Sequence, residues 1–166
     1  MKKSVVLMAA LLIVLLVCLT GCNTNFKFEN LGFVTEEVEE LTVCYGKDRK
    51  PTSNEEKIGR VIEELNSLDI EKCKEKVEEN VFNDSVVGKI IFKFKDKEGT
   101  FVMTFVETTV NGSKTSLLKC ETTDGLKIKK MPKDIYYMSS VEATNAMLNK
   151  IFANYMWFEK KLLKIK

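Results

Sequence analysis

Few side chains in this chain could do chemistry, because none of its 166 residues is a histidine. This absence excludes Ser-His-Asp and Cys-His catalysis, histidine general bases and histidine metal sites. The chain also lacks a Gly-rich phosphate loop, the G-x-S-x-G and S-x-x-K nucleophile motifs and EF-hand spacing. A ligand pocket or an active site would depend on carboxylates such as Glu107 and Glu121, and on Tyr136 and Tyr137. We expect no catalytic residue, no cofactor and no metal ion.

A cysteine at the end of an apolar run has the clearest chemical context. Lys2 and Lys3 precede the apolar segment Val5–Leu19. This segment is shorter than the ~20 residues that a helix needs to cross a bilayer, and a basic start followed by such a run is typical of a secretory signal peptide. The letters LTGC at 19–22 resemble the lipobox of bacterial lipoproteins.

The lipobox resemblance implies that Cys22 is lipidated and that a peptidase cuts between Gly21 and Cys22. Lipidation requires a thiol nucleophile, and a small preceding residue gives the peptidase access to the bond. The alternatives are an uncleaved anchor helix or a conventional signal peptide with Cys22 near its cut. We therefore expect a lipoprotein signal peptide at 1–21, a lipidated tether at 22–32 and a single α+β domain at 33–166, anchored to the cell membrane and facing outside the cytoplasm.

The charge balance of the mature chain argues against nucleic acid as a partner. The full sequence holds 26 Lys and Arg against 24 Asp and Glu, and Lys2 and Lys3 account for the difference. A chain whose side-chain charges balance has no basic footprint for nucleic acid. Two acyl chains suffice for stable anchoring, so we expect the lipid on Cys22 to hold the protein on the membrane.

Three cysteines, Cys44, Cys73 and Cys120, remain in the mature domain besides Cys22. An odd number leaves at least one thiol unpaired, although a compartment outside the membrane would permit one disulfide. Their wide spacing lacks any C-x-x-C pair. We favour small apolar packing residues over a disulfide.

The first half of the domain predicts a strand and then a loop. Residues 38–45 alternate apolar and polar side chains, as in a half-buried strand. Residues 46–54 are polar and contain Pro51, so they are expected to form a loop.

The next segment predicts a capped helix. Apolar residues recur at helical spacing over 54–67, with Ser53 or Asn54 available as the N-cap. Segment 68–82 is ambiguous, because its apolar residues fit a helical face while its alternating charges suit a solvated edge strand. We favour the strand.

The middle of the chain predicts an antiparallel meander in which Phe92 and Phe105 face inward. Asn111-Gly112 is a strong signal for a two-residue hairpin turn. Together with the preceding elements, the meander predicts an α+β fold. We expect an antiparallel sheet of about five or six strands, one helix after the first strand and a C-terminal helix packed on the sheet. The four strands of the meander are expected at 89–95, 100–110, 114–121 and 126–130.

The C-terminal segment is the candidate recognition surface. Ser139 and Glu142 have the spacing of a capping box, and a long aromatic and apolar helix follows. One stripe of this helix is expected to pack on the meander, which leaves other apolar residues for a partner or the membrane surface. For the lysines near its end we favour solvation, with contact to anionic headgroups as the alternative. The residues expected to bind a partner are Met156, Trp157, Lys160 and Lys161.

Several segments in this order resemble small extracytoplasmic lipoproteins of low-GC Gram-positive, clostridia-like bacteria, classed as domains of unknown function. After the lipobox these are VEELTVCYG, TSNEEKIGRVIEELNSLDIEK, GKIIFKFKDKEG and MPKDIYYMSS. The resemblance implies no activity and no catalytic residue. With histidine absent, we favour a non-catalytic, lipid-anchored domain that binds a protein, peptide or envelope component. The alternative is a small-ligand receptor or an envelope enzyme based on carboxylates and tyrosine.

Overall fold

The chain forms a run of consecutive strands together with separate helices, which is an α+β arrangement. A computed structural model describes residues 27–32, 34–68, 70–73, 77, 81–128, 131 and 137–163. The strands are β1 Val38–Tyr45, β2 Asp48–Thr52, β3 Glu71–Lys72, β4 Val86–Phe94, β5 Thr100–Val110, β6 Ser113–Thr122 and β7 Tyr137–Ser139. The helices are η1 Phe28–Leu31, η2 Thr35–Glu37, α2 Glu55–Asn66, α3 Val81–Asp84 and α4 Val141–Leu163.

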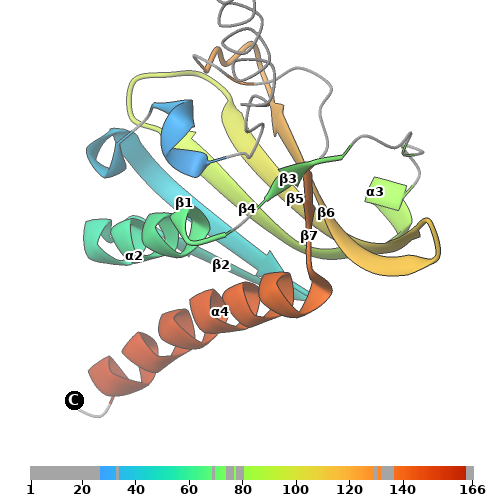
Figure 1. The fold of residues 1–166 in the computed structure, drawn as a ribbon. Coiled ribbons are helices and arrows are strands. Elements are labelled where there is room, and N and C mark those ends of the chain that lie inside the picture. Colours follow the sequence, from blue (N-terminus) through green and yellow to red (C-terminus); the bar gives the residue numbers. More distant parts are fainter. Residues whose placement is uncertain are drawn as a thin grey trace, which may run out of the picture.

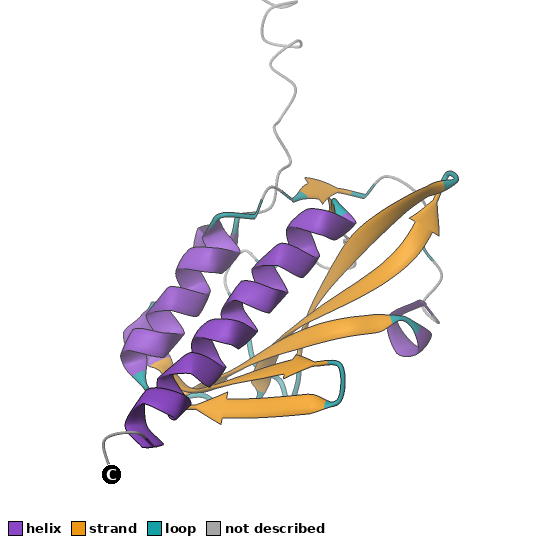
Figure 2. Ribbon diagram, turned by 90° about the horizontal axis from the view of Figure 1, so that it is seen from below, coloured by secondary structure: helices purple, strands orange, loops and turns teal. Residues whose placement is uncertain are grey.

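The strands form one antiparallel sheet in the order β2-β1-β4-β5-β6-β7-β3 (Figure 1). The helices α2 and α4 lie side by side over one face of this sheet (Figure 2). The predicted α+β class, with its meander β4-β5-β6 and its C-terminal helix on the sheet, is therefore confirmed. The sheet has more strands than the five or six predicted, because the sequence did not indicate β2 or β7.

Strand register places the large apolar side chains on the face that the helices cover. Leu41 pairs with Phe92, and Phe92 pairs with Phe101, so these three side chains form one row across β1, β4 and β5. Successive side chains of a strand point to opposite faces, which sends Phe105 to the same side. Phe92 and Phe105 are both fully buried, as predicted.

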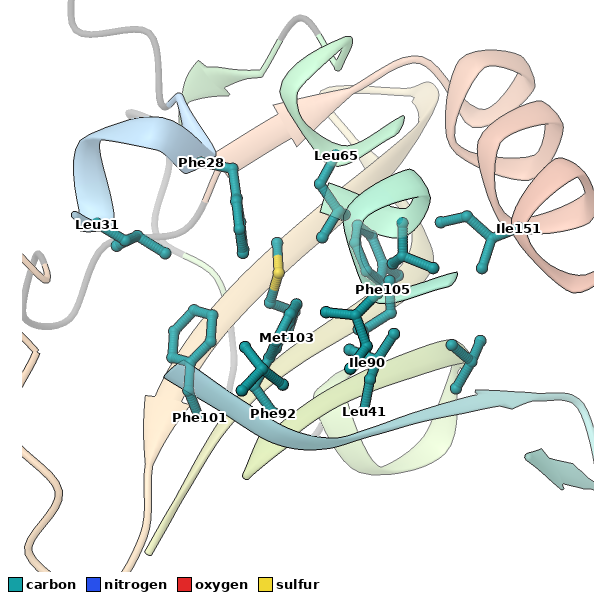
Figure 3. Packing of buried hydrophobic residues seen from close by; sticks show 14 of the residues in the cluster. Phe28, Leu31, Leu41, Leu65, Ile90, Phe92, Phe101, Met103, Phe105 and Ile151 are labelled. Carbon is teal, nitrogen blue, oxygen red and sulfur yellow. The ribbon is translucent and has the colours of Figure 1, made fainter. Parts of the chain in front are cut away.

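The core also includes η1, at the start of the described chain. The Phe28 ring is only 2% exposed and lies 5.4 Å from the ring of Phe92, centroid to centroid. Leu31 is buried beside it, and both side chains point down onto the sheet (Figure 3). The Glu29 N–H donates a 3.0 Å hydrogen bond to Asn66 Oδ1 and ties η1 to the end of α2. Part of the segment that the sequence assigned to a tether, residues 28–31, thus belongs to the core.

Local signals explain two elements that the sequence predicted well. Asn54 is the N-cap of α2, because its Oδ1 accepts the N–H of Lys57 at 3.0 Å and so satisfies a helix-end donor. Asn111 and Gly112 both have positive φ angles, 51° and 80°, in the turn between β5 and β6. A two-residue hairpin of this kind requires that backbone, which Asn and Gly tolerate.

The predicted loop at 46–54 is wrong, since β2 forms within it and pairs with β1. Pro51 lacks an N–H donor, but a strand at the edge of a sheet can accommodate it. The predicted strand at 126–130 is also wrong, because residues 126–128 form no strand and 129–130 lie outside the described residues. Strand β7 takes the place beside β6 instead.

Two smaller expectations are also corrected. Ser140, and not Ser139, caps α4, because its Oγ accepts the N–H of Ala143 at 3.0 Å. Ser139 is the last residue of β7. Within 68–82, where a strand was expected, only Glu71–Lys72 is a strand of the described part, and α3 begins at Val81.

Candidate functional site

A groove of about 500 Å³ lies where the C-terminal end of α2 meets the N-terminal half of α4. Lys150 Nζ lies 2.5 Å from Glu64 Oε1, so one ion pair joins the two walls. The sequence could not reveal this site, because its two walls lie about 80 residues apart in the chain and meet only in the folded domain. Its other lining residues are three serines, Ser67, Ser139 and Ser140, and the apolar Leu68, Ala143, Ala146 and Met147.

Two serine hydroxyls of the groove take part in hydrogen bonds at helix ends. Ser140 Oγ already accepts the Ala143 N–H, and Ser67 Oγ donates to the carbonyl oxygen of Glu64 at 2.7 Å. An activated serine needs a neighbouring base that takes its proton. Both hydroxyls instead make hydrogen bonds to backbone groups at helix ends.

Close packing fixes the N-terminal half of α4 on the sheet. Leu148 is fully buried, and a Cβ at Gly88 would lie 3.2 Å from its Cδ1 and 3.0 Å from the Cys44 carbonyl oxygen. Gly88 therefore allows the helix to approach β4 closely. Asn145 Nδ2 also donates a 2.6 Å hydrogen bond to Glu107 Oε1 on β5.

Glu107 and Glu121, the two carboxylates considered for a pocket or an active site, lie on opposite faces of the sheet. Glu107 pairs with Ser116, and Glu121 pairs with Val102, in a continuous register between β5 and β6. Alternation sends Glu107 toward α4 and Glu121 to the other face, where Lys119 Nζ lies 2.6 Å from Glu121 Oε1. The two carboxylates cannot share one substrate. Tyr136 and the side chain of Tyr137 lie outside the described residues.

One buried hydroxyl near α4 is left without a partner. Ser116 Oγ makes no hydrogen bond, and it is the one buried side-chain polar atom of this kind in the described part of the chain. Its neighbours across the strands are Glu107 and Ser139, which share its face of the sheet. An unsatisfied buried hydroxyl costs about 1–3 kcal/mol. The sequence does not predict that Ser116 is buried, because serines occur in strands at both buried and exposed positions.

The predicted partner-binding residues belong to the later turns of α4. The helix continues to Leu163, so Met156, Trp157, Lys160 and Lys161 are helical, and their side chains lie outside those described. Closer to the start of α4, the ring of Phe152 lies 5.7 Å from that of Tyr45, centroid to centroid. The predicted lipidation and cleavage residues, Cys22 and Gly21, lie outside the described residues.

The edges of the sheet are poor sites for pairing with another strand. Strand β2 has the sequence DRKPT, and its charges and proline are features that discourage edge-to-edge pairing. The opposite edge, β3, has only two residues, both charged. Of the surfaces that could bind a partner, the groove and α4 are therefore the stronger ones.

The three cysteines of the domain are free thiols. Cys73 is buried with Phe82 and Leu117 in a small cluster under α3, as expected for an apolar packing residue. Burial raises the pKa of the Cys120 thiol well above its ordinary value, and the nearby Glu121 carboxylate raises the pKa further. A thiol of raised pKa is a weak nucleophile at neutral pH.

Neither the described residues nor comparisons with known proteins identify a metal site, a membrane span or a family for this chain. Within the described ranges, no three Cys, Asp or Glu side chains are grouped closely enough to hold a metal ion. None of the helices described is both long and apolar enough to cross a membrane. No protein-family model, curated protein or solved structure significantly matches this chain.

Proposed function

We propose that this protein is a non-catalytic binding domain, held by lipid on the outer side of the cell membrane. The apolar run that ends in LTGC at 19–22 supports the anchor. The separation of Glu107 and Glu121 onto opposite faces supports binding over catalysis. Acid–base catalysis by two carboxylates requires both groups at one substrate.

A small-ligand receptor is the second candidate, and the groove between α2 and α4 favours it. Its volume of about 500 Å³ falls within the roughly 300–1,000 Å³ typical of small-molecule sites. Apolar side chains line it together with hydroxyls and the Glu64–Lys150 ion pair. Such a lining would suit a small zwitterionic ligand, whose charges could pair with Glu64 and Lys150.

The anchor is tested by replacing the nucleophile. Cys22→Ala should accumulate as the unprocessed precursor, because neither lipidation nor cleavage can proceed without the thiol. Intact-mass spectrometry of the membrane fraction distinguishes the precursor from the diacylated mature form. Cys18→Ala is the matched control, since it removes a cysteine from the signal segment and should be processed normally. A normal mature lipoprotein from Cys22→Ala would refute the anchor.

The groove is tested by filling it. Ala146→Trp places a large side chain on a lining position, whereas Ala153→Trp does so on an exposed position of the same helix. Thermal-shift measurements with free amino acids and dipeptides serve as the probe. We expect a binding compound to raise the Tm of the unmodified protein and of Ala153→Trp. The same compound should leave the Tm of Ala146→Trp unchanged. Equal shifts in all three proteins, or none, would count against the receptor.

A further inference from the structure

Besides its edges, the sheet presents the face that lies opposite to α2 and α4. One residue from each of the neighbouring strands β2, β1, β4, β5 and β6 is paired in a continuous register line (Figure 1). The pairs are Arg49 with Cys44, Cys44 with Lys89, Lys89 with Thr104, and Thr104 with Lys119. The chain neighbours of Cys44, Val43 and Tyr45, pack in the core under the helices. Alternation therefore directs Cys44 and the residues paired with it to the opposite face.

Three of these side chains are cationic and accessible, and we call Arg49, Lys89 and Lys119 the cation row. Arg49 is exposed, and the two lysines are half-buried. Arg49 and Lys89 make no ion pair with another residue of the described chain, whereas Lys119 Nζ lies 2.6 Å from Glu121 Oε1. Two of the three charges are thus left for an anionic partner, and the third has one internal competitor.

The spacing of the cation row limits the kind of partner that fits it. Adjacent strands are about 4.8 Å apart, so cations on alternate strands are separated by about 9.6 Å. A polyproline II peptide rises about 3.1 Å per residue with three residues per turn, so every third side chain lies on one side at intervals of about 9.3 Å. Side chains on one side of a β-strand recur at about 6.6 Å, and a nucleic acid strand carries a charge about every 3.4 Å. The polyproline II repeat matches the row best.

The surroundings of the row differ on its two sides. One step along the same face, Thr42 pairs with Ile91, and Ile91 with Val102. Ile91 and Val102 are only half-buried, so they offer apolar contact beside the charges. On the other side lies α3, since Lys119 Nζ is 5.7 Å from the centroid of the Phe82 ring. A bound chain would therefore lie along the row with its apolar residues over Ile91 and Val102.

We propose that the cation row binds an acidic segment of a partner protein in the polyproline II conformation, with Asp or Glu at every third residue. Its carboxylates pair with Arg49, Lys89 and Lys119, and Arg49 can hold its carboxylate with two parallel hydrogen bonds. The preformed polyproline II helix loses little conformational freedom on binding. This proposal rests on the proposed function as a binding domain and names the chemistry of the partner.

A labelled synthetic peptide of four Glu-Pro-Pro repeats is the probe. Its control has the same composition and charge, but its four glutamates are adjacent. Fluorescence anisotropy with the purified full-length protein in neutral detergent measures both affinities. We expect the repeat peptide to bind at least about fourfold more tightly than the control, because an exposed ion pair contributes about twofold to fivefold in affinity, and to dissociate at high salt. Equal affinity for the two peptides, or no binding of the repeat peptide, would overturn the proposal.

Matched charge changes test whether the row is the binding site. Arg49→Gln/Lys89→Gln should weaken binding of the repeat peptide by about 4-fold to 25-fold, from two lost ion pairs. Lys114→Gln/Lys127→Gln changes the net charge equally at two exposed positions outside the row and should bind as the unmodified protein does. Circular dichroism should be the same for all three proteins. Equal weakening in both double variants would refute the row.

A gain of affinity is expected when the internal competitor is removed. Glu121→Gln frees Lys119 from its ion pair and should strengthen binding of the repeat peptide by up to about fivefold. Partial unfolding could not produce such a gain. An unchanged or weaker affinity would contradict the assigned role of Lys119.

Two measurements separate this proposal from the proposed function. Cys22→Ala should bind the repeat peptide as the unmodified protein does, because the row lies within the domain, so a failed anchor leaves the row supported. Mass spectrometry of the peptide after incubation should show it intact. Cleavage of a peptide that binds through the row would refute a non-catalytic function and support the row. A lipidated protein that ignores the repeat peptide would refute the row and support the anchor.

Discussion

Replacing Phe28 tests whether folding begins before residue 33. Phe28 is 98% buried, since only 2% of it is exposed, and its ring lies 5.4 Å from Phe92 and 6.4 Å from Phe101. Removing a buried phenylalanine side chain costs about 3–5 kcal/mol. The segment η1 is short and lies near the start of the described chain, so it can detach locally and limit the loss. We therefore expect Phe28→Ala to lower the free energy of unfolding by about 3 kcal/mol.

Urea unfolding of the protein beginning at residue 23, followed by circular dichroism, measures this loss. Val34→Ala is the matched control, because Val34 is an apolar residue of the same stretch that is 55% exposed. Its replacement should change the free energy of unfolding by less than about 0.5 kcal/mol. If Phe28→Ala behaved like the control, the stretch would be a tether, and the inclusion of η1 in the core would be wrong.

Two further predictions concern a turn and the thiol of Cys120. Gly99→Ala should lower the free energy of unfolding by at least about 2 kcal/mol, because its φ is +88° and a Cβ would lie 2.1 Å from the Thr123 carbonyl oxygen. Gly112→Ala is the control, because Gly112 also has a positive φ, +80°, but no atom lies within 4 Å of its added Cβ. It should lower the free energy of unfolding by only about 1 kcal/mol. Similar urea midpoints for the two variants would contradict the predicted clash at Gly99. The raised pKa of Cys120 keeps its thiol neutral in the folded state above pH 9.0, where the unfolded thiol ionises. The free energy of unfolding should therefore fall as pH rises past about 9, by up to about 1.4 kcal/mol per pH unit, and Cys120→Ala should reduce that slope in urea melts at a series of pH values.

Local rules predicted those elements whose signals act within a few residues. The N-cap at Asn54 and the turn at Asn111-Gly112 each depend on one side chain or one φ angle, and both form as expected. Alternation along β4 and β5 also identified Phe92 and Phe105 as core residues, because the period of a strand fixes which face a side chain takes.

Elements that depend on distant partners were not predictable in the same way. Strand β2 resembles a loop by composition, and only its pairing with β1 makes it a strand. Residues 126–130 have a strand-like composition, but β7 is the strand that pairs with β6. The groove likewise depends on Glu64 and Lys150 lying next to each other. They do so only because α2 packs against α4. No periodicity in the sequence specifies that contact.

If lipid on Cys22 anchors the chain, as proposed, the burial of Phe28 limits the distance between the domain and the membrane. Six Cα-to-Cα steps separate Cys22 from Phe28, and a fully extended chain of that length spans only about 20 Å. An anchored domain would therefore search for its partner within a thin layer, by lateral diffusion in two dimensions. A partner in the same membrane would meet it at a high effective concentration, and a modest intrinsic affinity would suffice. Inserting a long flexible linker after Cys22 would dilute the domain in that layer and weaken the encounter without altering any contact.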